Sequence, residues 1–360
     1  MQELREENRS LREQLGLQVV QRQNDVKPAG RESRLQVGGL LQVQGEAGGR
    51  VDSRYTDDND RIFLRRARVN VQGRLVEDFD FRTEIEVTGS LAPATGLRGQ
   101  LTDAYVNWSR YRWLSFKAGQ FKTPFGFEQL YQDSRLYIPE RTLGSDRLTA
   151  SRQIGLAASG TLGEAGLLSY SVGAFNGTGT NASANDDDRF LYAGRIEGTL
   201  YEGRLAGLDT RLAAGIDGLT SRDRSVGFPA DFGFDSTPAT PGRDGIFAGR
   251  RRAVGVDAQL QLGRFELWGE VLQGRFSPEN RTPAPTVRAT ATSFLGAYML
   301  IPDRFQIVGR YDRFLDTATW TAGTNYYLRG HDLKLQLHYV RSDAGDAERQ
   351  RVIARLQTVF

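Results

Sequence analysis

Arginine is the residue type in this sequence that most clearly suggests a chemistry. Of the 47 basic residues only four are lysine, namely Lys27, Lys117, Lys122 and Lys334, and the other 43 are arginine. A guanidinium group keeps its charge and offers a planar fork of donors that suits phosphate and carboxylate groups. The composition therefore predicts contact with anions wherever arginines converge. The alternative is a genomic preference for arginine codons, which would carry no function.

The candidate anion-binding residues are basic side chains that alternate with apolar ones. In the segment 79–87, charged residues such as Arg82 and Glu84 alternate with mostly apolar residues, as in a strand with one wet face. The segments 305–312 and 333–339 show the same pattern. A basic residue at the lipid midplane costs about 2 to 4 kcal/mol, so the charged faces should line a water-filled interior. The candidates on strands are Arg66, Arg68, Arg82, Arg195, Arg211, Arg310, Lys334 and Arg355.

Arg66 and Arg68 are the leading pair, because two arginines on the same face of one strand can bind a single anion together. Acidic residues share the inward faces, namely Glu84, Glu86, Asp103, Glu197, Asp257, Glu270 and Asp312. The counts are close, so we expect separate basic and acidic walls with a modest preference for anions. The alternative is that opposed charges pair across strands and only stiffen the wall.

A long loop, residues 124–150, should position the remaining candidates. It exceeds roughly 15 residues, and its apolar content argues against disorder. Its basic residues are Arg135, Arg141 and Arg147, among the apolar residues Tyr131, Leu136, Tyr137 and Ile138. We interpret it as a constriction loop folded into the interior, with Lys122 at its root. Lys122 lies near an expected bulge, so the sequence leaves its facing open. The alternative is a loop that clasps a neighbouring protomer.

These residues belong to sixteen alternating segments of about 9 to 15 residues. Such lengths match tilted strands that cross a bilayer, and an even count returns both chain ends to one side. The predicted fold over residues 33–360 is an all-β, 16-stranded antiparallel transmembrane β-barrel. The segments lie near 34–46, 60–74, 78–89, 101–109, 113–123, 151–162, 167–176, 189–201, 207–218, 250–262, 265–275, 291–301, 304–315, 317–328, 331–342 and 349–360.

The connections between the segments alternate in length. Residues 163–165, 302–303 and 329–330 are tight turns, whereas 51–59, 124–150 and 220–249 are long. Only the connection near Asp316 is tight at a place where the alternation predicts a long one. Barrels of this kind have short periplasmic turns and longer outside loops, so the termini should lie in the periplasm of an outer-membrane protein. A soluble sandwich would not show this alternation.

Aromatic residues near the strand ends suit the two membrane interfaces. The last residue, Phe360, closes a strand whose alternate residues from Val352 onward are mostly apolar, while Arg355 and Gln357 occupy the opposite face. On its own this strand could also be an ordinary amphipathic strand of a soluble core. The expected interfacial aromatics are Trp108, Trp113, Tyr326, Tyr327 and Phe360.

Residues 1–24 differ from the rest of the chain. Leu4, Leu11 and Leu15 follow heptad spacing, and Asn8 takes a polar core position of the kind that fixes register. We predict a short periplasmic α-helical coiled coil, followed by a linker over 25–32. The alternative is a tail that lies on the barrel or stays disordered. Residues 1–20 lack the apolar region of a secretory signal, so we expect a mature form.

Several chemistries find no support in the sequence. There are no cysteines, and the only histidines, His331 and His338, are too few for a metal cluster or a catalytic triad. The mean hydropathy is −0.47, and no run approaches the roughly 20 apolar residues of a membrane helix. Acidic runs at 57–60 and 186–188 could hold calcium or bridge lipopolysaccharide, or be solvated loop tips. We therefore expect no enzyme, cofactor, metal site or nucleic-acid partner.

Four short motifs resemble the phosphate-selective porin O and P family. They are residues 63–69, 104–106, 119–128 and 325–328, of which Gly-Gln-Phe-Lys-x-Pro-Phe-Gly at 119–126 is the most specific. The resemblance covers about residues 33–360. It implies a trimeric 16-stranded barrel with an inward-folded third loop, which passes phosphate along basic residues with lysines prominent at the constriction. The bases here are nearly all arginine, so phosphate is one candidate among small anions.

The sequence thus favours an outer-membrane porin for passive diffusion of small anionic or polar solutes through a water-filled, arginine-lined trimeric barrel. Its expected partners are two further copies of the chain, outer-membrane lipid, lipopolysaccharide and small anions. The alternative is an envelope tether, in which the coiled coil reaches toward peptidoglycan and the barrel is mainly an anchor.

Overall fold

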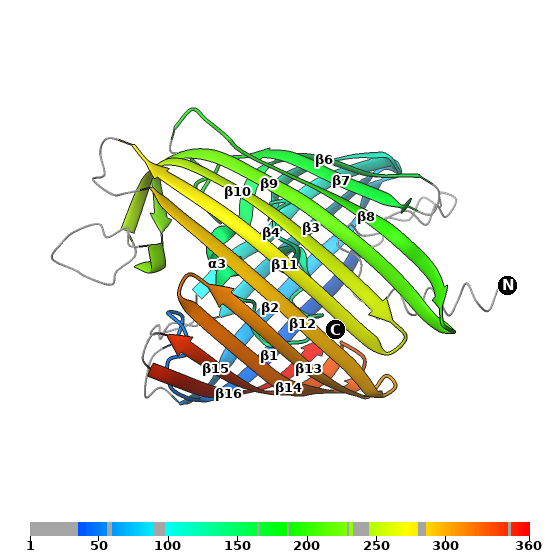
Figure 1. Cartoon of the computed structure of the whole chain (residues 1–360). Coiled ribbons are helices and arrows are strands. Elements are labelled where there is room, and N and C mark those ends of the chain that lie inside the picture. The colour runs from blue at the N-terminus through cyan, green and yellow to red at the C-terminus, as the bar shows by residue number, and fades with distance from the viewer. Residues whose placement is uncertain are drawn as a thin grey trace.

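Sixteen strands close into one antiparallel barrel in the computed structural model (Figure 1). Consecutive strands pair with each other, and β1 (Leu35–Gly48) completes the ring by pairing with β16 (Ala347–Val359). The predicted strand number and antiparallel barrel are confirmed. The structure describes residues 35–360 apart from 56–59, 89–97, 164–165, 186, 229, 233–244, 280–285 and 345–346. The predicted coiled coil, with Leu4, Asn8, Leu11 and Leu15, and the linker over 25–32 lie outside the described residues.

The remaining elements follow in chain order. The strands are β2 (Arg61–Val76), β3 (Phe79–Thr88), β4 (Arg98–Tyr111), β5 (Leu114–Lys122), β6 (Arg152–Leu162), β7 (Leu168–Phe175), β8 (Leu191–Leu205), β9 (Leu208–Phe228), β10 (Gly245–Leu262), β11 (Phe265–Pro278), β12 (Val287–Ile301), β13 (Phe305–Phe314), β14 (Thr317–Arg329) and β15 (Leu333–Ala344). Short helices are α2 (Phe127–Leu130), α3 (Leu143–Leu148) and the 3-10 turn η2 (Ala230–Phe232). No helix in the described part of the chain is long and apolar enough to cross a membrane.

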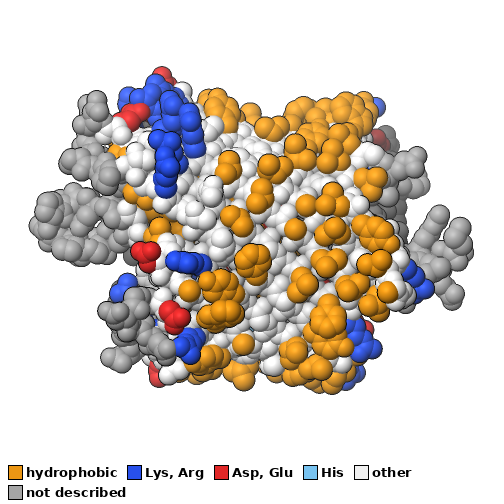
Figure 2. Space-filling model, viewed as in Figure 1, with side chains coloured by type: hydrophobic (Ala, Val, Ile, Leu, Met, Phe, Trp, Pro, Cys, Tyr) orange, Lys and Arg blue, Asp and Glu red, His pale blue; other side chains and the backbone are white. Residues whose placement is uncertain are grey.

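Side chains alternate between the outside and the lumen because successive residues of a strand point to opposite faces of the sheet. On β16, Val352 and Leu356 point outward and are 43% and 44% exposed, whereas Arg355 and Gln357 point inward and are buried. The same alternation on the other strands produces the broad apolar surface around the barrel (Figure 2). A membrane-spanning barrel requires an apolar outer band of this kind.

The two ends of the barrel differ in the length of their connections. At one end, the short-turn end, strands are joined by 77–78, 112–113, 163–167, 206–207, 263–264, 302–304 and 330–332. At the other, the long-loop end on the left of Figure 1, the connections include 49–60, 123–151, 176–190 and 229–244. Two connections at the long-loop end, 315–316 and 345–346, are tight, whereas the sequence indicated only the first.

The expected long loop over 220–249 is partly wrong. β9 continues to Phe228 and β10 begins at Gly245, so this hairpin reaches well beyond the neighbouring strands. Residues 221–224 are polar and charged, and they alternate in a pattern that a strand accommodates. Ser221 and Asp223 are buried, and Arg251 on β10 donates to Ser221 at 3.1 Å. Backbone pairing therefore persists outside the apolar band.

One expected interfacial aromatic faces the wrong way. Tyr326 is 39% exposed on the outer surface, but Tyr327 is buried and its hydroxyl donates to Gln306 at 2.7 Å in the lumen. Neighbouring residues of a regular strand point to opposite faces, so only one of the two tyrosines lies on the outer surface here. Trp113 and Phe360 are 53% and 70% exposed, which agrees with an interfacial place.

Candidate functional site: the constriction loop and the lumen cavity

The loop between β5 and β6, residues 123–151, folds into the barrel, and we call it the constriction loop. At its root, the backbone N–H of Thr123 donates to the carbonyl oxygen of Ser151 at 2.9 Å. Its rings pack against inward side chains of β11, β12 and β13. The cluster comprises Phe127, Tyr131, Leu136, Tyr137 and Ile138 of the loop and Trp268, Leu295, Ala297 and Val308 of the wall. The loop is therefore fixed by an apolar core, as its composition predicted.

Inward polar side chains of the wall bind the backbone of the constriction loop. Lys334 donates to the carbonyl oxygen of Leu136 at 2.8 Å, and Arg310 donates to that of Glu140 at 2.8 Å. Arg355 donates to the carbonyl oxygen of Pro139. These three predicted bases point inward, as expected, but the loop covers them and takes up their hydrogen bonds.

Arg66 and Arg68 bind one anion together, and that anion belongs to the protein. Asp133 of the constriction loop lies 3.4 Å from Arg66 and forms a closer ion pair with Arg68. Arg141, also in the loop, donates to Oδ1 of the same carboxylate, the oxygen nearest Arg66, while Arg68 contacts Oδ2. Burial opposes the charge, but the surrounding guanidinium groups outweigh it and hold the pKa of Asp133 well below its usual range. The leading pair is thus occupied by an internal carboxylate.

A β-bulge adds a third arginine to this wall. The register between β1 and β2 shifts between Gln42 and Val43, which leaves Arg65 as the extra residue. Arg65 reaches Glu140 of the loop at 2.7 Å, and Arg355 pairs with the same carboxylate oxygen, Oε1. Burial works against ionisation, but the two arginines hold the pKa of Glu140 well below its usual range.

Two further predicted bases are also paired. Arg195 lies 2.7 Å from Asp217 and 2.6 Å from Asp257. Arg310 lies 3.1 Å from Glu128 of the loop, in addition to its contact with Glu140. For these residues the structure agrees with the alternative in which opposed charges pair within the lumen.

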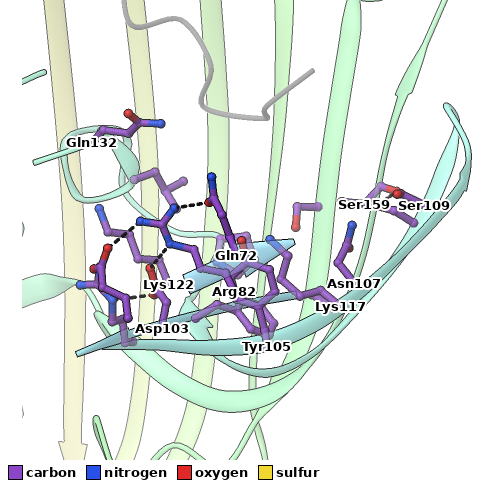
Figure 3. A pocket seen from close by; sticks show the side chains of 18 of the residues that line it. Gln72, Arg82, Asp103, Tyr105, Asn107, Ser109, Lys117, Lys122, Gln132 and Ser159 are labelled. Atoms are coloured by element: carbon purple, nitrogen blue, oxygen red, sulfur yellow. Dashed lines mark hydrogen bonds and ion pairs between the residues drawn. The ribbon is translucent and has the colours of Figure 1, made fainter. Parts of the chain in front are cut away.

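Lys122 points into the barrel at the root of the constriction loop. Its ammonium group donates to the carbonyl oxygens of Gln129 at 2.7 Å and Tyr131 at 3.0 Å. It also lines the lumen cavity (Figure 3). The Lys122 side chain, whose direction the sequence left open, therefore points inward. Its hydrogen bonds hold the first part of the constriction loop in place.

A cavity of about 550 Å³ lies between the constriction loop and a wall formed mainly by β2 to β8, with Gly38 to Leu40 of β1, Val359 and Phe360 also in its lining. It extends from Lys122 and Asp133 to Tyr111 and Arg112 beside a short turn. Four acidic side chains line it, namely Glu84, Asp103, Asp133 and Glu197. The seven basic ones are Arg68, Arg82, Arg112, Lys117, Lys122, Arg152 and Arg195. The lining therefore carries a formal excess of three positive charges.

Arg82 and Arg152 share the carboxylate of Asp103 at the centre of this wall. Arg152 lies 2.8 Å from Asp103, while Arg82 lies 3.9 Å from it and 2.6 Å from Glu84. Gln72 accepts a further hydrogen bond from Arg82 at 2.8 Å. Figure 3 shows Arg82 between these partners, with its side chain along the cavity surface. The Arg82 side chain remains 26% exposed, so solutes can reach it.

Lys117 differs from the other cavity bases in its partners. Its ammonium group lies 4.3 Å from the centroid of the Tyr105 ring and 5.4 Å from that of Phe121. No carboxylate in the described part of the chain lies within ion-pair distance of it. The wall around it is rich in hydroxyl and amide groups, namely Asn107, Ser109, Ser115, Ser159, Thr161, Ser169 and Ser171. This wall offers charge and hydrogen bonds to a small polar solute.

The other predicted bases lie away from the cavity. Arg141 is buried in the loop, where it also donates to the carbonyl oxygen of Tyr131 at 2.7 Å. Arg147 on α3 pairs with Asp231 at 2.7 Å, toward the long-loop end. Arg211 donates to Thr199 at 3.1 Å. Arg135 is partly buried and is not among the residues that line the cavity.

Sequence reasoning missed five residues that matter here. Arg65 was hidden by the bulge, which makes two adjacent arginines face inward. Asp133 and Glu140 were overlooked because only the basic residues of the loop were weighed as candidates. Lys117 lies inward in the middle of β5 and Arg152 directly follows the loop at the start of β6. Reading the alternation through β5 would have found Lys117 on the same face as Ser115. Among the residues that the structure describes, no cluster of histidine, aspartate and glutamate side chains could hold a metal ion.

Comparison with known proteins identifies the family. The family model described as phosphate-selective porin O and P matches residues 41–360. The chain belongs to this family. No curated protein matches the sequence significantly. Membership and fold place this porin in the outer membrane as a channel rather than an enzyme.

Solved porin structures share the fold at low sequence identity. An anion-selective porin from Comamonas acidovorans aligns with a TM-score of 0.63 and 14% identity, covering 91% of this chain and 100% of that chain. The trimer form of OmpT from Vibrio cholerae aligns at 0.61 and 12% identity, covering 91% and 99%. OprB from Pseudomonas putida aligns at 0.58 and 12% identity, covering 91% and 94%. At such identities the likeness concerns the fold.

Proposed function

We propose that this porin is a passive diffusion channel with a modest preference for small anions over cations, phosphate among them. The observation that carries the proposal is the cavity wall of β2 to β8, whose lining has seven basic and four acidic side chains. Fixed charges that line a water-filled lumen raise the local concentration of counter-ions and so bias conduction. The excess is small, so the bias should be modest.

The proposal assigns anion contact to a subset of the predicted bases. Arg82, Lys122 and the unpredicted Lys117 and Arg152 line the cavity, whereas Arg66, Arg310, Lys334 and Arg355 lie under the constriction loop. Of the cavity bases, Lys117 has no ion-pair partner among the described residues, and Arg82 stays partly exposed. These two should meet a passing anion most directly inside the cavity, because Arg68, Arg152 and Arg195 are held by carboxylates, Lys122 is held by loop carbonyls, and Arg112 lies beside the short turn.

The test is ion selectivity in planar bilayers under a salt gradient. The reversal potential of the wild-type porin should indicate a preference for anions, and chloride, phosphate and a small dicarboxylate should all permeate. The variant K117Q should shift the reversal potential toward cations. Arg110 is a matched control that also removes one charge, since it is not among the residues that line the cavity and its side chain is 61% exposed. A reversal potential near zero in the wild-type porin, or equal shifts in R110Q and K117Q, would reject the proposal.

We also propose that the porin is a homotrimer. The support is the trimer form of the Vibrio cholerae neighbour and the family to which this chain belongs. The heptad spacing of residues 1–24 remains a prediction of a parallel three-stranded coiled coil. Mass measurement of detergent-extracted protein tests the trimer, and deletion of residues 1–24 should lower its thermal resistance without closing the pores. A monomeric mass would overturn the assembly.

A further inference from the structure

Three arginines form a row on the outer surface of the barrel near the long-loop end. Arg252 on β10 pairs in register with Arg275 on β11, and Arg275 pairs in register with Arg288 on β12. All three side chains are exposed, because they occupy outward positions of their strands. Figure 2 shows basic side chains gathered at this end, at the upper left, beyond the apolar surface. We call Arg252, Arg275 and Arg288 the arginine row.

The arginine row has no counter-charge within the described part of the chain. None of its members forms an ion pair or a side-chain hydrogen bond with a described residue. By contrast, Arg222 on the neighbouring strand β9 forms an ion pair with Glu279. Adjacent strands lie about 4.8 Å apart, and like charges directly opposite each other destabilise a sheet. An anion from outside the chain would relieve this repulsion.

The depth of the row coincides with the outer edge of the apolar band. On β11 the outward face runs from Phe265, 50% exposed beside a short turn, to Arg275 ten residues later. Ten residues span about 33 Å along a strand. With a strand tilt of about 35 to 45°, this corresponds to roughly 25 Å of membrane thickness, which is the height of the apolar band in such barrels. The row therefore lies at headgroup level.

Below the arginine row, toward the centre of the membrane, the outward side chains of β10, β11 and β12 change from polar to mainly apolar. One outward position further into the membrane, Gln273 pairs with Thr290 and with Val254. The next outward positions are Val256, Val271 and Thr292, and the position after Thr292 on β12 is Phe294; Val256 is 50% and Phe294 57% exposed. From the long-loop end inward, the surface thus offers cations, then hydrogen-bonding groups, then a mainly apolar face. This is the order of phosphate, sugar and acyl chain in a phosphorylated glycolipid.

We propose that the arginine row binds the phosphorylated headgroup of lipid A, the glycolipid anchor of lipopolysaccharide in the outer leaflet. Guanidinium groups bind phosphate in a bidentate manner, and three in one row can share one or two phosphate groups. Gln273 and Thr290 would contact the sugar, and the acyl chains would lie along Val256 and Phe294. The long loops of such barrels face the cell exterior, which puts the row in the correct leaflet. The proposal rests on membrane location and strand direction, and is independent of solute selectivity.

The test compares lipids that differ only in phosphate. Purified wild-type porin and the variant R252Q/R275Q/R288Q are titrated in detergent with bisphosphorylated lipid A and with its dephosphorylated form, and bound lipid is counted by native mass spectrometry. The control R264Q/R304Q/R329Q removes the same charge from exposed arginines at the short-turn end. Neutralising outward arginines should not impair folding, and unchanged single-channel conductance of the variant verifies this.

Wild-type porin and the control should bind bisphosphorylated lipid A at least tenfold more tightly than the dephosphorylated form, and the row variant should lose this difference. Equal binding of the two lipids, or equal loss in the control, would overturn the proposal. Competition by inorganic phosphate at concentrations equal to the lipid would reduce the row to a simple anion site and also overturn it. If the row variant keeps lipid A but loses its oligomeric mass, the row contacts another protomer and the lipid proposal fails.

Discussion

Arg66 on β2 and Arg82 on β3 face the same lumen from neighbouring strands, but they meet different surroundings. The Arg66 side chain is 5% exposed and lies against Asp133 of the constriction loop, whereas the Arg82 side chain is 26% exposed and lines the cavity. The difference follows from where the loop lies. It contacts inward side chains of β11 to β16, β1 and β2, and a cavity separates it from much of the wall of β3 to β8. We refer to these as the covered wall and the open wall.

The comparison shows that an inward arginine is not by itself a solute contact. On the covered wall, guanidinium groups serve as donors and counter-ions for loop groups such as Asp133, Glu140 and the carbonyl oxygens of 136–140. A buried charge is costly without a partner, so the loop and the covered wall stabilise each other. On the open wall, Arg195 is paired in the same way, but Arg82 keeps 26% of its side chain exposed beside Asp103 and Glu84.

The largest expected effect comes from removing the loop carboxylates. D133N/E140Q leaves several buried guanidinium groups without their counter-ion, and breaking a buried pair costs about 3 to 5 kcal/mol. We expect a large fall in the urea midpoint of unfolding, followed by tryptophan fluorescence, and noisier single-channel conductance. D209N is the control, because its pair with Arg204 is 56% and 69% exposed and should contribute at most about 1 kcal/mol. Equal midpoints for the two variants would contradict the loop attachment.

Replacing Lys122 at the root of the loop should lower the stability of the barrel by a smaller amount. K122M leaves the carbonyl oxygens of Gln129 and Tyr131 without their donor. An unsatisfied buried acceptor costs about 1 to 3 kcal/mol. We expect a lower unfolding midpoint and more frequent brief closures in bilayer recordings. K122R keeps a donor and should recover part of the midpoint, whereas full stability of K122M would show that the apolar core alone holds the loop.

The direct contrast of the two walls is R82Q against R66Q. A unit charge about 6 Å from an ion in water contributes under about 1 kcal/mol, so R82Q should lower the anion-to-cation permeability ratio by roughly twofold. R66Q should change it less, because the Arg66 side chain is 5% exposed and lies under the constriction loop beside Asp133, where a permeating ion does not reach it. Exposed charges are screened within about 10 Å at 0.1 M salt, so the effect of R82Q should shrink as salt rises. A larger shift in R66Q than in R82Q would reverse the assignment of the walls.

The smallest expected effect is a change of stability with pH that depends on Asp133. Its pKa lies well below the usual range because of the arginines around it. A group with a lowered pKa stabilises the fold above its unfolded pKa, and this contribution is lost as pH falls through the folded value. The stability difference between wild-type porin and D133N should therefore stay constant from pH 8 to about 5 and narrow below about pH 4. A difference that disappears near pH 6 would show that Asp133 is not held ionised.

The strand pattern was predictable because it is local. A period of two along β3 or β15 shows which residues share a face, and the cost of charge in lipid decides which face is inward. The inward fold of the constriction loop was predictable too, because its aromatic and aliphatic residues need a core. The long β9–β10 hairpin was not, since Ser221 and Asp223 read as loop residues until their partner strand is known.

The sequence by itself determined the barrel, its sixteen strands, the facing of most strand residues and the apolar nature of the loop. Only the tertiary structure decided which arginines face water. Arg68 and Asp133 are 65 residues apart, and Arg355 and Glu140 are 215 apart, so no local pattern relates them. They meet because closure of the barrel brings β16 beside β1 and because the loop crosses the lumen to one side. The face of the sheet on which a side chain lies follows from the local alternation along its strand. The partner of a charged side chain depends on how the whole barrel closes.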